Sequence, residues 1–346
     1  MTRARALGRA AELPAVDRLL ALAARRRFLP DDFSRTLGPE PLSFDGDVVT
    51  QMLFDRLRPE DVDEVVARAA ADPELSRMPP IGDDPPARRW LALNYGTWLG
   101  MPAVFERTGL KPDRPPEGIH AMARGPLAAA GGLGEADLVV DAIRSAGADV
   151  ADAGGALDFG CSSGRVVRVL QAAFPQVDWY GCDPNRAAIA WASEHLPGID
   201  FSVSPEEPPL PMVEGALGLA YAISIWSHFD PEFGLRWFDE MHRVIRPGGF
   251  LVFTTHGLQS VAYYVEKQER SVLQAREIVA SLYRHGHWYA CEFGQDGDDG
   301  IVNPQWGTAF LSAEWLLSRL CPDWRVLEFA PGRNQRNQDV YVIQRV

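Results

Sequence analysis

The sequence predicts an α/β fold, a Rossmann-like and doubly wound sheet of seven strands with mixed directions. Three observations lead to this prediction. Short apolar runs alternate with amphipathic segments over residues 155–255, which is the pattern of parallel βαβ units. The run at 155–159 leads into a turn of small residues, 160–164, and then into a helical segment, as in nucleotide-type cofactor sites. Two more strand-like runs follow after a long insertion.

Length and composition narrow the class of protein. The 346 residues suffice for two structural units or one enlarged α/β domain, and 46% of them are hydrophobic. A formal net charge of -13 argues against a general nucleic-acid-binding face, because phosphates would be repelled. No apolar run reaches the roughly 18 residues of a membrane span, so we expect no stable membrane insertion. No CxxC spacing and no secretory leader accompany the cysteines, which predicts reduced thiols in a cytoplasmic protein (Cys161, Cys182, Cys291 and Cys321).

Residues 1–114 are expected to form a mainly helical N-terminal region, and residues 115–346 the sheet-containing domain. Residues 61–70 have helical periodicity. Aromatic residues in 90–99 predict packing of the first unit onto the second, with a substrate mouth as the alternative. The proline-rich stretch 112–116 predicts the linker.

The first 27 residues carry seven arginines against Glu12 and Asp17. We interpret this stretch as a solvated amphipathic helix, because basic runs are usually solvated faces. A mitochondrial-type presequence or a membrane-surface helix is the alternative. The N-terminal unit could also mediate a homodimer.

The domain is predicted to alternate strands with helices. Asn185 and Ser312 are expected to cap the helices that they precede. The insertion at 258–307 is expected to form a lid or substrate wall. Strands are predicted at 155–159, 177–183, 199–203, 216–223, 250–255, 324–329 and 340–343, and helices at 135–146, 163–174, 185–195, 231–245, 261–283 and 312–320.

Two acidic residues beside the glycine loop indicate what it binds. Asp183 ends the second strand 19 positions after Gly164, and its carboxylate can accept both hydroxyl hydrogen bonds of a ribose diol. Asp158 precedes Gly160, where it would repel a pyrophosphate and attract a cofactor bearing an ammonium and a sulfonium. The glycine spacing is also shorter than the G-x-G-x-x-G dinucleotide fingerprint. A dinucleotide oxidoreductase remains an alternative.

Residues 156–256 resemble the class I S-adenosylmethionine (SAM) dependent methyltransferases. The resemblance rests on an ordered set of motifs, at 157–165, 180–183, 208–211, 221–229, 246–249 and 254–257. The stretches 307–312 and 338–340 are similar to a branch often found beside polysaccharide and other glycan-biosynthesis genes.

The resemblance implies SAM as cofactor and a set of residues that bind it. Asp158 would lie near the methionine ammonium, Asp183 would hold the ribose, and Glu206 would border the adenine. Arg165 could reach a cofactor carboxylate or form a surface ion pair. Ser162 departs from the family, which usually has glycine there; its side chain could crowd the cofactor or bond its carboxylate. The implied cofactor-binding set is Asp158, Gly160, Cys161, Ser162, Gly164, Arg165, Asp183, Pro184, Glu206 and Ser224.

Methyl transfer to an alcohol also needs a proton acceptor, and histidine suits that role near neutral pH. His256 and His228 follow the fifth and fourth strands, whose ends open toward the cofactor side of the sheet, although either could be structural. Tyr264, His285 and Trp306 in the insertion suit a flat, hydroxylated acceptor, or simply pack the insertion onto the sheet.

The function predicted from the sequence is SAM-dependent O-methylation of a hydroxyl on a sugar, glycan or related small molecule, without a metal. The Gly- and Asp-rich stretch 295–300 resembles a cation loop, but it lacks a distal bidentate acid and is interpreted as solvated. N- or C-methylation of a small metabolite and SAM binding without catalysis are the alternatives.

Overall fold

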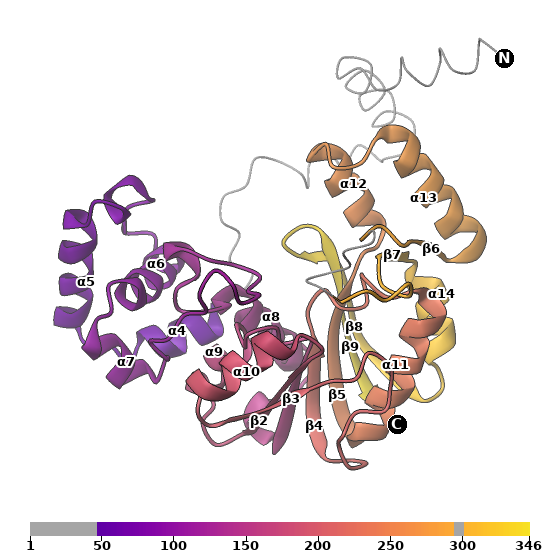
Figure 1. Ribbon diagram of the computed structural model, residues 1–346, viewed down its shortest axis with the longest axis horizontal. Coiled ribbons are helices and arrows are strands. Elements are labelled where there is room, and N and C mark those ends of the chain that lie inside the picture. Colours follow the sequence, from indigo (N-terminus) through magenta and orange to yellow (C-terminus); the bar gives the residue numbers. More distant parts are fainter. Residues whose placement is uncertain (1–46, 294–300) are drawn as a thin grey trace, which may run out of the picture.

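The computed structural model describes residues 47–293 and 301–346 (Figure 1). The expectations for the first 27 residues and for 295–300 therefore concern residues outside the described part. A seven-stranded sheet has the order β3-β2-β1-β4-β5-β9-β8; β1 to β5 are parallel and β9 runs antiparallel to both of its neighbours. The predicted Rossmann-like mixed sheet is confirmed. Its strands are β1 Gly155–Phe159, β2 Asp178–Asp183, β3 Ile199–Val203, β4 Leu217–Ala222, β5 Ile245–Thr255, β8 Trp324–Asn334 and β9 Gln338–Arg345.

Helices cover both faces of the sheet (Figure 1). Alternate residues of β1 enter different cores, since Ala156 packs with one hydrophobic cluster and Leu157 with the other. The first cluster contains residues of the helices α8 Leu133–Ser145, α9 Val167–Ala173 and α10 Arg186–His195. The second cluster contains residues of α11 Pro231–Val244 and α14 Ala313–Leu320.

Two predicted helix caps are present. The Asn185 side chain accepts hydrogen bonds from the first turn of α10, and Ser312 accepts one from Trp315 N in α14. The helix predicted from residue 163 instead begins at Val167, because residues 162–166 form a turn in which Gly164 has a φ of +77°.

The N-terminal helices lie beside the α8–α9 side of the sheet (Figure 1). Asp137 in α8 accepts hydrogen bonds from Val49 N, at 2.6 Å, and from the Thr50 hydroxyl, also at 2.6 Å. Arg56 donates to the carbonyls of Thr108 and Ala172 near the ends of two helices, where a cation is favourable. The N-terminal helices are α4 Val48–Phe54, α5 Pro59–Ala71, α6 Pro85–Trp98 and α7 Pro102–Thr108.

The insertion differs from the prediction in two respects. The expected helix over 261–283 is two helices, α12 Leu258–Glu266 and α13 Val272–His285. The break is explained by Gln268, whose φ is +62°, and by Ser271, which caps α13 in a capping box with Gln274. The insertion also contributes β6 His287–Ala290 to a two-stranded sheet that was not predicted, and its partner β7 Thr308–Leu311 directly follows the insertion.

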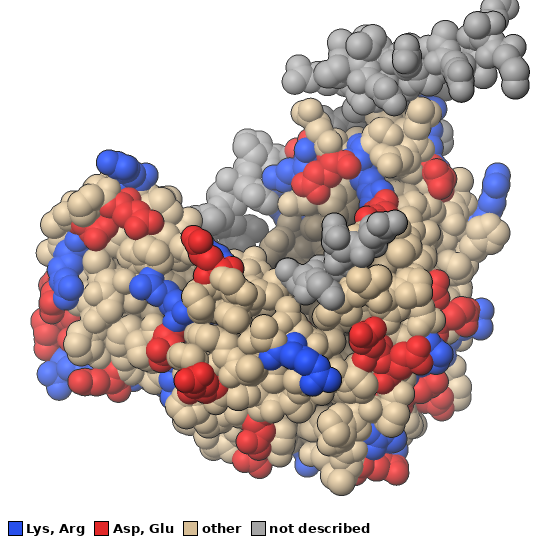
Figure 2. Space-filling model, viewed as in Figure 1, with Lys and Arg blue, Asp and Glu red and all other residues tan. Residues whose placement is uncertain are grey.

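Within the described residues, no helix is long and apolar enough to cross a membrane. The face shown in Figure 2 has acidic and basic side chains interspersed over the N-terminal helices and the insertion.

Candidate active site

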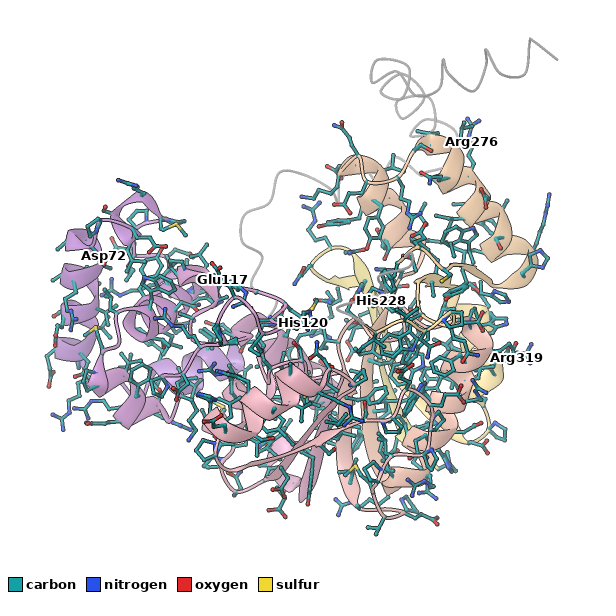
Figure 3. The ribbon with its side chains drawn as sticks, viewed as in Figure 1. Asp72, Glu117, His120, His228, Arg276 and Arg319 are labelled. Atoms are coloured by element: carbon teal, nitrogen blue, oxygen red, sulfur yellow. The ribbon has the colours of Figure 1, made fainter. Side chains whose placement is uncertain are left out.

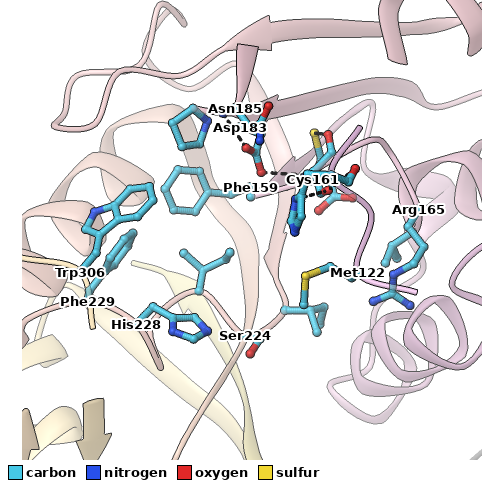
Figure 4. Close-up of a pocket in the computed structure, with 18 of the residues that line it drawn as sticks. Met122, Phe159, Cys161, Arg165, Asp183, Asn185, Ser224, His228, Phe229 and Trp306 are labelled. Carbon is cyan, nitrogen blue, oxygen red and sulfur yellow. Dashed lines mark hydrogen bonds between the residues drawn. The ribbon is translucent and has the colours of Figure 1, made fainter. Parts of the chain in front are cut away.

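A cavity of about 420 Å³ lies at the carboxyl ends of β1, β2 and β4 (Figure 4). Residues far apart in the sequence meet there, because parallel strands end at the same edge of the sheet. The predicted residues that line the cavity are Asp158, Gly160, Cys161, Ser162, Arg165, Asp183, Pro184, Ser224, His228, Tyr264 and Trp306.

Four predicted residues do not line this cavity. Gly164, the last residue of the glycine loop, packs against Leu196. Glu206 is exposed and accepts a hydrogen bond from Asn303. His256 is buried behind Tyr264, which lines the cavity, and 2% of its surface is exposed. His285, exposed at the end of α13, borders a separate hollow beside Trp315.

The Asp183 carboxylate is fixed by the backbone around it. Ser162 N donates to Oδ2 and Asn185 N donates to Oδ1, both at 2.8 Å. Figure 4 shows this carboxylate beside Cys161 of the glycine loop. A carboxylate can accept several hydrogen bonds at once, a property that suits the two hydroxyls of a ribose.

Ser162 has a φ of +50°, in the left-handed region that favours glycine. Its hydroxyl lies 2.8 Å from Nδ1 of His120 and 3.3 Å from the His120 carbonyl. In this structure the hydroxyl therefore holds a neighbouring loop of the chain. In Figure 3, His120 lies toward the N-terminal helices and His228 toward the insertion.

Asp158 is 4% exposed, and burial raises its pKa to about 7 although the Tyr221 hydroxyl and Arg165 act in the opposite direction. Arg165 forms an ion pair with Glu135 at 2.8 Å, and Glu135 also lines the cavity. The guanidinium is thus paired with a carboxylate of α8 while it also lines the cavity.

A buried polar network centres on Gln338 of β9. Its Oε1 accepts a hydrogen bond from the Thr254 hydroxyl, and its Nε2 donates to Ser224 Oγ, both at 2.6 Å. Ser224 N in turn donates to Thr254 Oγ1 at 2.7 Å, which holds Ser224 at a φ of +65°. The antiparallel strand thereby positions the loop after β4.

His228 and His256 have the same tautomer. The Nδ1 atoms lie 3.0 Å from the Gly307 carbonyl and 3.1 Å from the Ala309 carbonyl, and a carbonyl only accepts, so each Nδ1 carries a proton. Nε2 is then the acceptor nitrogen in both rings. The Nε2 of His228 has no hydrogen-bond partner among the described residues, whereas the Nε2 of His256 lies 2.9 Å from Tyr264 Oη.

Sequence reasoning missed His120, Glu135, Asn334 and Gln338, all of which line the cavity. Gln338 lies in a stretch that carried the resemblance, but the others come from segments with no motif. In the part of the chain that the structure describes, no three His, Cys, Asp or Glu side chains are grouped to hold a metal ion.

Comparison with known proteins assigns a class to this site. Residues 156–249 match a family described as a methyltransferase domain. Together with the sheet order, this match shows that residues 156–249 belong to a SAM-dependent methyltransferase domain of the Rossmann-like α/β class.

Among curated proteins, the chain is similar to malonyl-[acyl-carrier protein] O-methyltransferase of Alcanivorax borkumensis, 28% identical over 153 residues, 43% of this chain and 50% of that protein. It is also similar to phthiotriol/phenolphthiotriol dimycocerosates methyltransferase 1 of Mycobacterium ulcerans, 32% identical over 100 residues, 28% of this chain and 36% of that protein. The matches thus span about half or less of these relatives' length. A SAM-dependent methyltransferase structure from Mesorhizobium loti is 14% identical, with a TM-score of 0.40, over 59% of this chain and 96% of that one.

Proposed function

We propose that this protein transfers a methyl group from SAM to an oxygen of a small or carrier-linked acceptor, with His228 as the proton acceptor. The observation that carries the proposal is the position of the His228 side chain. It faces the cavity from the loop after β4, with an acceptor nitrogen and with Nδ1 held by Gly307.

The residues present fit SAM. Asp183 offers a fixed carboxylate for a ribose diol, and Asp158 offers a second carboxyl group for an ammonium. SAM supplies a methyl group on a positively charged sulfur. Ser224 and the glycine loop would enclose its amino-acid end, and the cavity would exclude water.

The acceptor side of the cavity is aromatic. The rings of Phe229 and Trp306 have centroids 6.0 Å apart, and Phe293 lies 5.5 Å from the ring of His228. Such walls suit a flat or extended acceptor whose hydroxyl meets His228. A sugar or glycan hydroxyl is the acceptor that the sequence predicts, and the relatives' names add carrier-linked acyl groups and lipids as acceptor classes to test.

Calorimetry with SAM, S-adenosylhomocysteine and NAD tests the cofactor. We expect SAM and S-adenosylhomocysteine to bind and NAD not to bind. Binding of NAD without binding of SAM would refute the proposal. Methyl transfer is then measured by mass spectrometry on sugars, malonyl-carrier protein and amines. Product on an oxygen acceptor supports O-methylation, product on amines alone favours the N-methylation alternative, and SAM binding without product on any acceptor favours a non-catalytic protein.

The homodimer and the cytoplasmic location stay predictions. Sedimentation of the full chain measures the first, and cell fractionation measures the second.

A further inference from the structure

A second cavity, of about 350 Å³, lies behind the glycine loop. Its walls come from the end of α6, the segment 114–131 and the start of α9. Four arginines line it together with one carboxylate, that of Glu117, although the chain as a whole has a net charge of -13 (Arg114, Arg124, Arg165 and Arg168). Figure 3 shows Glu117 at the junction of the N-terminal helices and the sheet.

Arg168 forms the buried end of this cavity, with 3% of its surface exposed. One terminal nitrogen donates to the Lys111 carbonyl, and Nε has no hydrogen-bond partner among the described residues. A buried cation is costly unless it is paired or hydrogen-bonded, so this guanidinium favours an anion beside it.

Arg124 and Arg114 lie at the exposed mouth of the cavity. Arg124 donates to the carbonyls of Pro115, at 2.6 Å, and Ile119, while Arg114 lies 4.1 Å above the ring of Trp98. These contacts hold both guanidinium groups in place without neutralising them.

The other charged groups around the cavity do not cancel the positive charge of Arg114, Arg124 and Arg168. Arg165 is already paired with Glu135. Glu117 lines the wall and Asp113 acts on Arg168 from a distance, but no ion pair joins either acid to an arginine within the described ranges. One lining carboxylate, with Asp113 nearby, therefore stands against three arginines that form no ion pair among the described residues.

We propose that this cavity binds a small organic phosphate, separately from the cofactor. Three guanidinium groups approach one volume, which suits a dianion with several acceptor oxygens better than a single carboxylate. Ser163 also lines the cavity and offers a hydroxyl, and the apolar part of the ligand would lie on Trp98, Pro115 and Pro116.

Calorimetric titration of inorganic phosphate into the full chain, at constant ionic strength, tests the proposal. Saturable binding of one phosphate is expected, tighter than binding of acetate, and still present when S-adenosylhomocysteine saturates the first cavity. No saturable binding, equal affinity for acetate, or displacement by S-adenosylhomocysteine would overturn it. The last readout separates this proposal from the proposed methyl transfer, which does not depend on it.

Variants locate the bound phosphate. Arg124→Gln is expected to weaken binding about tenfold, the value of one charge-assisted hydrogen bond, and Arg168→Met to abolish it. Arg144→Gln, at an exposed position in the last turn of α8, is the matched control and should bind as the unchanged protein does. Because Arg168→Met could fail to fold, the exposed Arg124 decides the outcome: equal affinities for Arg124→Gln and Arg144→Gln would refute the site.

Discussion

The Tyr264 hydroxyl lies 2.9 Å from Nε2 of His256, yet only the tyrosine lines the cavity. Since Nδ1 of His256 donates to Ala309, its Nε2 accepts the phenolic proton. Burial, with a smaller effect of His228, lowers the pKa of His256 to about 3, so this ring is neutral at physiological pH. We infer that His256 positions Tyr264, and that His228 is the histidine placed to meet an acceptor.

His228→Ala is therefore expected to lower kcat by about 10²- to 10⁴-fold, the usual contribution of a general base. SAM affinity should remain within about twofold, because the proton acceptor faces the methyl acceptor. Steady-state kinetics and calorimetry measure the two effects. His285→Ala, on the exposed end of α13, should retain full activity; a His228→Ala enzyme as fast as this control would exclude His228 as the base.

Asp183→Asn is expected to weaken SAM binding at least about tenfold, because the ionised acceptor for the ribose hydroxyls is lost. Calorimetry measures the affinity. Asp178→Asn is the matched control, since Asp178 is exposed at the opposite end of the same strand. Equal SAM affinity in the two variants would contradict the ribose assignment.

SAM affinity is expected to rise between about pH 6 and pH 8. The pKa of Asp158 is about 7, raised by burial, so the carboxylate that attracts an ammonium forms only across this range. The same shift makes the folded state bind a proton that the unfolded chain has lost, so this group lowers the free energy of unfolding as pH rises from about 4 to about 7.

Calorimetry over this pH range, with Asp158→Asn as the comparison, isolates the contribution of Asp158 to SAM affinity. At pH 8 the variant should bind SAM more weakly than the unchanged protein does. Its SAM affinity should also rise less between pH 6 and pH 8. An identical pH profile in both proteins would show that Asp158 does not face the cofactor.

Ser162→Gly is expected to be more stable than Ser162→Ala by about 1 kcal/mol. Both variants lose the hydrogen bonds to His120, but only alanine keeps a Cβ at a φ of +50°, which costs about 1–2 kcal/mol, offset in part by the greater unfolded-state entropy of glycine. Urea denaturation measures the difference. If Ser162→Ala were as stable as Ser162→Gly or more stable, the turn would not be strained.

The sequence predicted the central sheet well because local signals and long-range packing agree there. Strands β1 and β3 have the predicted bounds, and Asn185 and Ser312 cap their helices. The prediction of one helix over 261–283 was wrong because the composition of residues 267–271 is compatible with a helix. The signal that a second helix begins there is the capping box formed by Ser271 and Gln274.

Part of the site could not be predicted because it is made by tertiary contacts alone. His120 approaches the glycine loop from an irregular segment, and Gln338 reaches Ser224 only because β9 lies beside β5. His256 follows the strand end as predicted, but the short sheet of β6 and β7 lies over it. Each of these strands has four residues, and they pair across a long stretch of sequence, so the pairing is a tertiary contact.

The hydrogen bonds of Asp137 affect how this chain can be divided. A fragment starting at residue 115 would keep every strand of the sheet and lose Val49 and Thr50, the partners of this carboxylate. It would also uncover the apolar surfaces of α8 and α9 that α4 covers, and exposed surfaces of this kind promote aggregation. The methyltransferase segment is thus recognisable by its sequence alone, but we expect a fragment limited to it to be less soluble than the chain with its N-terminal helices.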